Sequence, residues 1–148
     1  MGNAPASSAR RAACRAAGGA AGGVNTKDNV AKAILDMSNG GVDMAIDSVG
    51  ASSWADSLKS LRRGGRLVTC GATSGANPPA DLQRMFIRQL EIYGSTGGSV
   101  GEFRQLLDVF ARGLVKPEID SQFAIADVRS ALDRLSAGAQ FGKVSLIV

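Results

Sequence analysis

Three apolar segments of this sequence each run directly into a loop that contains glycine. These loops are residues 48–50, 70–75 and 94–98, and small hydroxyl residues accompany the glycines. In an open parallel sheet, ligands bind beyond the carboxyl ends of the strands, and glycine lets a flat ligand approach the backbone closely. One such turn could merely join a strand to a helix. Three turns at the same sheet edge favour a ligand site.

Several other kinds of chemistry are excluded or disfavoured. The sequence has no histidine, so it can form neither a histidine-containing zinc site nor a Ser-His-Asp triad. Its two cysteines, Cys14 and Cys70, are expected to be reduced, and no base is apparent that would make Cys70 a nucleophile. Asp47 could act within the site or cap the next turn. The sequence therefore indicates no catalytic and no metal-binding residue.

The net charge of +4 belongs to one end of the chain. Residues 1–27 hold four basic residues and no acid, whereas residues 28–148 hold 13 basic and 13 acidic residues. A neutral body gives no basic face for nucleic acid. No stretch approaches 18 consecutive apolar residues, so no membrane span is predicted. We expect a cytoplasmic protein, with an organelle transit peptide as the alternative.

The first 23 residues differ in composition from the rest. They are rich in alanine, glycine and arginine and contain no aromatic residue, isoleucine, leucine or valine. Such a segment buries too little apolar area to offset its ordering entropy. Three interpretations remain open: a disordered tail, a wrongly assigned start or shifted reading frame before a truncated gene, and an Arg-rich transit peptide.

Residues 24–148 show a regular alternation of helices and strands. Helices are expected at 28–38, from Ser52 or Ser53 to the glycines at 64–65, at 79–89, from Ser99 to Gly113, and at about 126–137. Strands are expected at 42–47, 66–70, 91–93 and 143–148, and Trp54 is expected to pack in the core. This order implies βαβ units, a parallel sheet and one α/β domain over residues 24–148.

The same segments resemble a known family. GGVDMAIDSVGASSWADSLKSLRRGGRLVTCGATSGANPP resembles the fourth and fifth strands of the medium-chain dehydrogenase/reductase superfamily, which includes alcohol dehydrogenases and quinone oxidoreductases. EIYGSTGGS resembles the sixth strand and its loop, and AGAQFGKVSLIV resembles the C-terminal strand. The resemblance covers residues 24–148 in order. It implies the C-terminal half of a Rossmann doubly wound parallel sheet that binds NADP or NAD.

The resemblance also implies particular cofactor contacts, most of them made through the backbone. They are Val49 and Gly50 at the nicotinamide ribose, Gly71, Ala72 and Thr73 at the carboxamide, Ser95 and Thr96 at the nicotinamide end, and Lys143 near the phosphates. An equally acceptable interpretation makes Lys143 a solvent-facing strand residue.

Other parts of the family's cofactor site have no counterpart in residues 24–148. Strands 1 and 2, the G-x-G-x-x-G turn and the catalytic domain are not recognisable, and residues 24–26 resemble only the end of strand 3. Strand 42–47 would then lie at a sheet edge. We therefore expect cofactor binding in the millimolar range or weaker. The isolated chain is expected to have no dehydrogenase activity, because no domain holds a substrate against the nicotinamide.

Three alternatives to the interpretation as a cofactor-binding part of an oxidoreductase remain open. DMAIDSVG followed by LRRGGRLV also suits half of an S-adenosylmethionine-dependent methyltransferase, although the further βα units after Gly71 disfavour it. A second alternative is a non-catalytic module that forms a homodimer through the edge strand Glu91–Gly94, and a third is a truncated gene product. The expected partner is a nicotinamide dinucleotide, with a second copy of the chain in the dimer alternative and with neither nucleic acid nor membrane.

Overall fold

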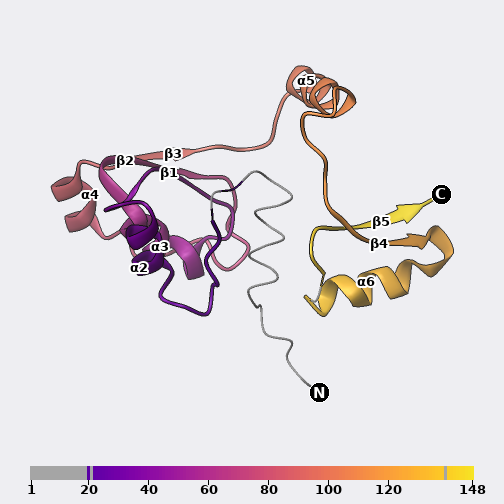
Figure 1. Ribbon diagram of the computed structural model, residues 1–148, viewed down its shortest axis with the longest axis horizontal. Helices are drawn as coiled ribbons and strands as arrows, with labels where there is room; N and C mark the ends of the chain where they lie inside the picture. Colours follow the sequence, from indigo (N-terminus) through magenta and orange to yellow (C-terminus); the bar gives the residue numbers. More distant parts are fainter. Residues whose placement is uncertain (1–19, 21, 139) are drawn as a thin grey trace. The chain divides into compact units, whose positions relative to one another are not determined.

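The computed structural model describes residues 20, 22–138 and 140–148, which fall into two compact units. One unit is Val24–Gly98 and the other contains Ser99–Val148. Figure 1 traces both units along the chain. The domain predicted for residues 24–148 thus spans two units, and the segment predicted as a tail lies almost wholly outside the described residues.

The first unit is built on a three-stranded parallel sheet with the strand order β1-β2-β3. Its strands are β1 (Val42–Asp47), β2 (Leu61–Thr69) and β3 (Glu91–Gly94), which alternate along the chain with the helices α2 (Val30–Met37), α3 (Ala51–Ser60) and α4 (Leu82–Arg88). Thr69 pairs with Asp47 on one side and with Gly94 on the other. The carboxyl ends of all three strands therefore meet at one edge, as the sequence predicted.

The core of this unit lies on one face of the sheet, beneath α3. Leu58 of α3 and Leu61 and Leu67 of β2 are fully buried. Trp54 packs against this cluster, as predicted, together with Val42, Ala45, Leu90 and Ile92. Leucine and branched side chains fill the space between helix and sheet, and their removal from water stabilises the unit.

The strand β1 is the open side of the sheet. Among the described residues it pairs only with β2, so it lies at the edge that the sequence analysis expected. Two apolar side chains of β1, Met44 and Ile46, are 49% and 72% exposed. A strand suited to the interior of a larger sheet therefore presents both backbone groups and apolar side chains at its free edge.

The boundary between α3 and β2 differs from the prediction. The helix ends at Ser60 rather than at the glycines 64–65, and β2 begins at Leu61 rather than at Arg66. Leu61 follows Trp54 and Leu58 at helical spacing, but its backbone is extended (φ −76°, ψ 138°). Leu61 enters the core from the strand, and an irregularity in the β1–β2 register accommodates the residues between Leu61 and Arg66.

The caps of the helices explain smaller differences. Asn29, rather than Asp28, caps α2 by accepting a hydrogen bond from the Lys32 N–H at 3.1 Å. Asp81 caps α4, which is shorter than the predicted helix 79–89. The backbone of Asp81 is left-handed (φ 46°), a conformation that aspartate tolerates better than most residues.

The second unit begins with α5 (Val100–Ala111). Ser99 opens this helix, as predicted, through reciprocal hydrogen bonds with Glu102. The chain then forms β4 (Ile119–Ala124), a short 3₁₀ turn η1 (Ile125–Asp127), α6 (Val128–Ser136) and β5 (Lys143–Ile147). The strands β4 and β5 pair in parallel. The strand β4 was not predicted, because the residues at its centre (Asp120–Gln122) are polar.

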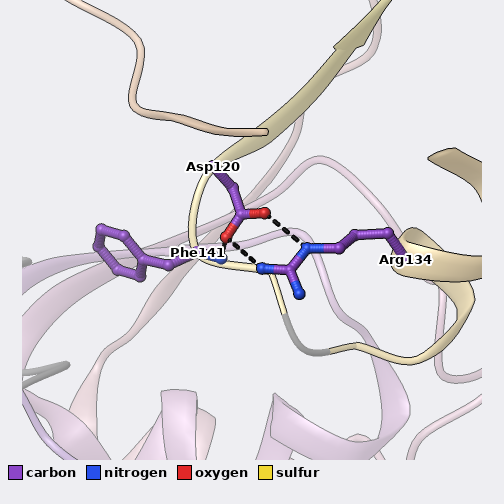
Figure 2. A network of polar contacts seen from close by, with 3 residues as sticks. All are labelled: Asp120, Arg134 and Phe141. Carbon is purple, nitrogen blue, oxygen red and sulfur yellow. Dashed lines mark hydrogen bonds and ion pairs between the residues drawn. The ribbon is translucent and has the colours of Figure 1, made fainter. Parts of the chain in front are cut away.

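In the second unit, an ion pair and a backbone hydrogen bond link β4, α6 and the turn before β5 (Figure 2). The Arg134 guanidinium on α6 donates two hydrogen bonds to the Asp120 carboxylate on β4, at 2.8 and 2.9 Å. The Phe141 N–H, in the turn before β5, donates a third at 2.9 Å. The Asp120 side chain is only 10% exposed. The Arg134 guanidinium and then the Phe141 N–H hold the pKa of Asp120 far below its ordinary range.

Candidate functional site

The candidate site consists of the three loops that follow β1, β2 and β3. Backbone hydrogen bonds continue the pairing of the strands into these loops. The Cys70 N–H donates to the Asp47 carbonyl at 2.9 Å, and the Ser95 N–H donates to the Thr69 carbonyl at 2.9 Å. The start of each loop is thereby fixed beside its neighbour.

The loops after β1 and β2 are stacked against each other. The Ser74 N–H and hydroxyl both donate to the Val49 carbonyl, at 2.8 and 2.7 Å. The Ala51 N–H donates to the Gly75 carbonyl at 3.0 Å, and the Ser52 N–H donates to the Ser74 Oγ at 3.0 Å. Ser74, in the loop after β2, is therefore hydrogen-bonded both to the loop after β1 and to the first turn of α3.

A glycine in each stacked loop permits this packing. A Cβ on Gly50 would lie 2.6 Å from the Gly75 carbonyl oxygen and 2.8 Å from Ala72 Cα, and the φ of Gly50 is +93°. A Cβ on Gly71 would lie 2.6 Å from the Ser48 carbonyl oxygen. These glycines were predicted to allow a ligand to approach, whereas the structure gives loop packing as their immediate reason. In the loop after β3, by contrast, a Cβ on Gly94 or Gly97 would meet nothing within 4 Å.

Asp47 anchors the turn between β1 and α3. Its side chain is buried and accepts hydrogen bonds from the N–H groups of Val49 and Gly50, at 2.8 and 3.0 Å, and from the hydroxyls of Ser53 and Ser57. Burial opposes ionisation of the carboxylate. Hydrogen bonds from Gly50, Ser57, Ser53 and Val49 outweigh burial and hold the pKa of Asp47 below its usual value. Of its two possible roles, Asp47 fulfils the capping one.

Seven of the eight predicted cofactor contacts lie at this edge of the first unit. Gly50 is buried and Gly71 is half-buried, while the other five are exposed: Val49, Ala72, Thr73, Ser95 and Thr96. Lys143 is the first residue of β5, in the second unit, where its N–H donates to the Glu118 carbonyl at 2.8 Å. Lys143 is therefore not one of the residues that the three loops bring together.

The exposed loops keep some backbone donors available. Asp47 and Ser74 engage the N–H and the carbonyl of Val49. The N–H groups of Thr73 and Thr96, by contrast, have no hydrogen-bond partner within the described part of the chain. Two free amides beside an open surface can receive a planar acceptor such as a carboxamide oxygen. These residues fit a nicotinamide group.

The residues do not fit a zinc ion. The sequence has no histidine, and the described residues contain no cluster of three or more potential His, Cys, Asp or Glu ligands. Cys70, which was expected in a buried strand, is an exposed free thiol just beyond the end of β2. In the described ranges, no helix is long and apolar enough to cross a membrane.

Sequence reasoning placed Ser74 in the loop 70–75 but gave it no role. Its hydrogen-bond partners lie 22 to 25 positions earlier in the chain, and no residue near Ser74 in the sequence indicates them. Asp47 was noticed, and the glycine three residues later is the signal of its role. An acidic residue at a strand end can accept the N–H groups of the tight turn that follows.

Comparison with known proteins agrees with this geometry. The model of a family described as zinc-binding dehydrogenase matches residues 4–112, a range that begins within the Ala- and Gly-rich segment. The "Probable quinone oxidoreductase" of Schizosaccharomyces pombe is 31% identical over 133 residues, which cover 81% of this chain and 39% of that protein. The chain therefore spans about two fifths of the length of this curated relative.

Solved structures give the same result. The alcohol dehydrogenase of the archaeon Aeropyrum pernix superposes with a TM-score of 0.74 at 26% identity, over 84% of this chain and 36% of that one. The 2-octenoyl-CoA carboxylase reductase CinF, solved with NADP and 2-octenoyl-CoA, gives 0.72 at 26% identity, over 80% and 26%. The chain thus has the α/β fold of the C-terminal part of a Rossmann domain. It belongs to the zinc-binding dehydrogenase family of the medium-chain dehydrogenase/reductase superfamily.

Proposed function

We propose that this chain supplies the nicotinamide-facing wall of an NAD(P)-binding site in an oxidoreductase of the alcohol dehydrogenase or quinone oxidoreductase type. The observation that carries the proposal is the meeting of three strand ends at one edge, with the Thr73 and Thr96 N–H groups exposed and unpaired within the described ranges. Family membership supports a nicotinamide rather than another flat ligand.

In this proposal the chain binds and orients the cofactor. A bound nicotinamide would supply the ring that accepts or donates hydride. Thr73 and Thr96 would donate their N–H groups to the carboxamide, while Asp47 and Ser74 would hold the loop of Val49 and Gly50 in place. Preorganised loops reduce the entropy that binding costs. Asp47, the carboxylate at this edge, is buried and engaged by the N–H groups and hydroxyls of its own turn, so we propose no turnover by this chain on its own.

Nicotinamide mononucleotide and adenosine monophosphate together test which half of the cofactor binds here. We expect the nicotinamide compound, at concentrations on the order of 10 mM, to shift the amide signals of Thr73 and Thr96 in an ¹⁵N-correlated NMR titration. Adenosine monophosphate should leave them in place, and the amide of Ser121 on β4 serves as an internal reference. Equal shifts with both compounds, or none with either, would contradict the proposal.

A second proposal concerns a homodimer through β3. The observation in its favour is that, in the described ranges, β3 pairs only with β2, which leaves its outer edge open. We expect light scattering to report twice the monomer mass of 15.2 kDa. Amide hydrogen exchange of Glu91–Gly94 should slow as protein concentration rises, because new pairing protects an edge strand. A monomer at all concentrations would rule this interface out.

A further inference from the structure

A groove between α2, α3 and α4 lies apart from the strand-end loops. It has a volume of about 470 Å³ and is lined by Asn29, Ala31, Lys32, Leu35, Asp36, Asp56, Lys59, Arg84 and Arg88. None of the residues assigned to the candidate cofactor site lines it. Three different helices contribute its basic residues, so the fold rather than one stretch of sequence brings these charges together.

Positive charge exceeds negative charge in this groove. Four basic side chains face two acidic ones, and one acid is neutralised by the pair between Lys32 and Asp36 at 3.1 Å. Arg84 also contacts Asp81, at 3.5 Å, and Asp81 lines an adjoining depression that shares Arg84 and Arg88 with the groove. The remaining acid, Asp56, faces more than one unneutralised cation.

Arg88 is the most informative of these residues. It is half-buried, and no side-chain hydrogen bond or ion pair involves it in the part of the chain that the structure describes. Its guanidinium is not among the buried side-chain groups of the described residues that lack a partner, so it is accessible to a ligand. Arg84 lies one helical turn before it, and like charges at this spacing destabilise a helix. A bound anion would relieve this repulsion.

We infer that this groove binds a small phosphorylated anion. The guanidinium groups of Arg84 and Arg88 can each donate two parallel hydrogen bonds to phosphate oxygens, and the Lys59 ammonium adds a third cation from α3. A compact ligand with two or more negative charges fits within this groove and matches its excess positive charge. Inorganic pyrophosphate is the simplest probe of this class.

Titration of the full chain with pyrophosphate tests the inference. Isothermal titration calorimetry should show saturable binding, and amide shifts should fall on α4 rather than on the strand-end loops. We expect the double variant Arg84→Gln/Arg88→Gln to weaken the affinity about tenfold or more, because charge-assisted hydrogen bonds are lost. The control Arg104→Gln/Arg112→Gln removes the same charge from exposed positions of the second unit and should leave the affinity within about twofold.

Several outcomes would overturn the inference. They are no saturable binding to the unaltered chain, equal weakening in both double variants, and equal affinity for citrate, a tricarboxylate of similar charge. If the Arg84→Gln/Arg88→Gln variant does not fold by circular dichroism, Lys59→Gln takes its place. Unchanged pyrophosphate affinity in a folded Lys59→Gln variant would likewise count against the groove.

Discussion

Replacing Gly50 with alanine is expected to lower the free energy of unfolding of the first unit by about 3 kcal/mol. The added Cβ would come within 2.6 Å of the Gly75 carbonyl oxygen and 2.8 Å of Ala72 Cα, so the stacked loops would have to separate. The left-handed backbone of Gly50, at φ +93°, adds strain for any residue with a side chain. Urea denaturation followed by fluorescence of Trp54, the sole tryptophan, measures this loss.

Gly64 provides a matched control for this substitution. Its φ is +70°, but an added Cβ would meet nothing within 4 Å. Gly64→Ala should therefore cost only the backbone penalty of about 1 kcal/mol. The difference between the two variants reports the contact between the loops together with the more restrictive backbone of Gly50 (φ 93°, ψ −132°). Equal destabilisation by both would show that loop packing contributes nothing beyond backbone conformation.

Replacing Asp47 with asparagine is expected to lower the free energy of unfolding by about 3 kcal/mol at neutral pH. The carboxylate is 4% exposed and accepts hydrogen bonds from two N–H groups and two hydroxyls. The amide of asparagine has the same shape but turns an NH₂ group toward some of these donors, which leaves them buried without acceptors. Urea denaturation with Trp54 fluorescence again provides the measurement.

Asp43 is the control for Asp47. It lies on the same strand, its side chain is 80% exposed, and it contacts the exposed Arg62. Because surface ion pairs contribute little, Asp43→Asn should change the free energy of unfolding by less than about 0.5 kcal/mol. A similar effect of both substitutions would mean that the loss of one negative charge, rather than the capping geometry, determines stability.

The dependence on pH gives a second check on Asp47. The folded state lowers its pKa below the value of 3.8 expected for an unpaired aspartate. The ionised form therefore contributes stability that is fully present above the unfolded pKa and is lost as the pH falls through the folded pKa. The difference between the unaltered chain and Asp47→Asn should be constant from about pH 6 to pH 8 and should shrink below about pH 4.

Element boundaries were predicted correctly where they depend on residues that are close together in the sequence. The strand Val42–Asp47 was predicted residue for residue, and Ser99 was predicted correctly as the residue that opens α5. The α3–β2 boundary was predicted wrongly, because Leu61 satisfies a helical hydrophobic period while belonging to a strand. Helical spacing of apolar residues does not show whether the last of them is buried as part of the helix or as the first residue of the following strand.

The candidate site shows the same limit at longer range. Its location followed from the strand ends, because parallel strands must deliver their loops to one edge. The contacts that fix the loops could not be predicted, since Ser74 and Val49 lie 25 positions apart. The sequence also could not show why glycine stands at positions 50 and 71. Close approach of a ligand and close approach of another loop both require the absence of a Cβ.

The open edge of β1 also bears on how this unit behaves in concentrated solution. Among the residues that the structure describes, no strand pairs with its outer backbone groups, and its side chains Met44 and Ile46 are 49% and 72% exposed. An edge of this kind is a template on which strands of other molecules can assemble into aggregates. Within Val42–Asp47, the acidic side chain of Asp43 is the exposed charged group that opposes such growth. Colloidal stability of this unit therefore depends on keeping β1 covered, independently of how firmly its core is packed.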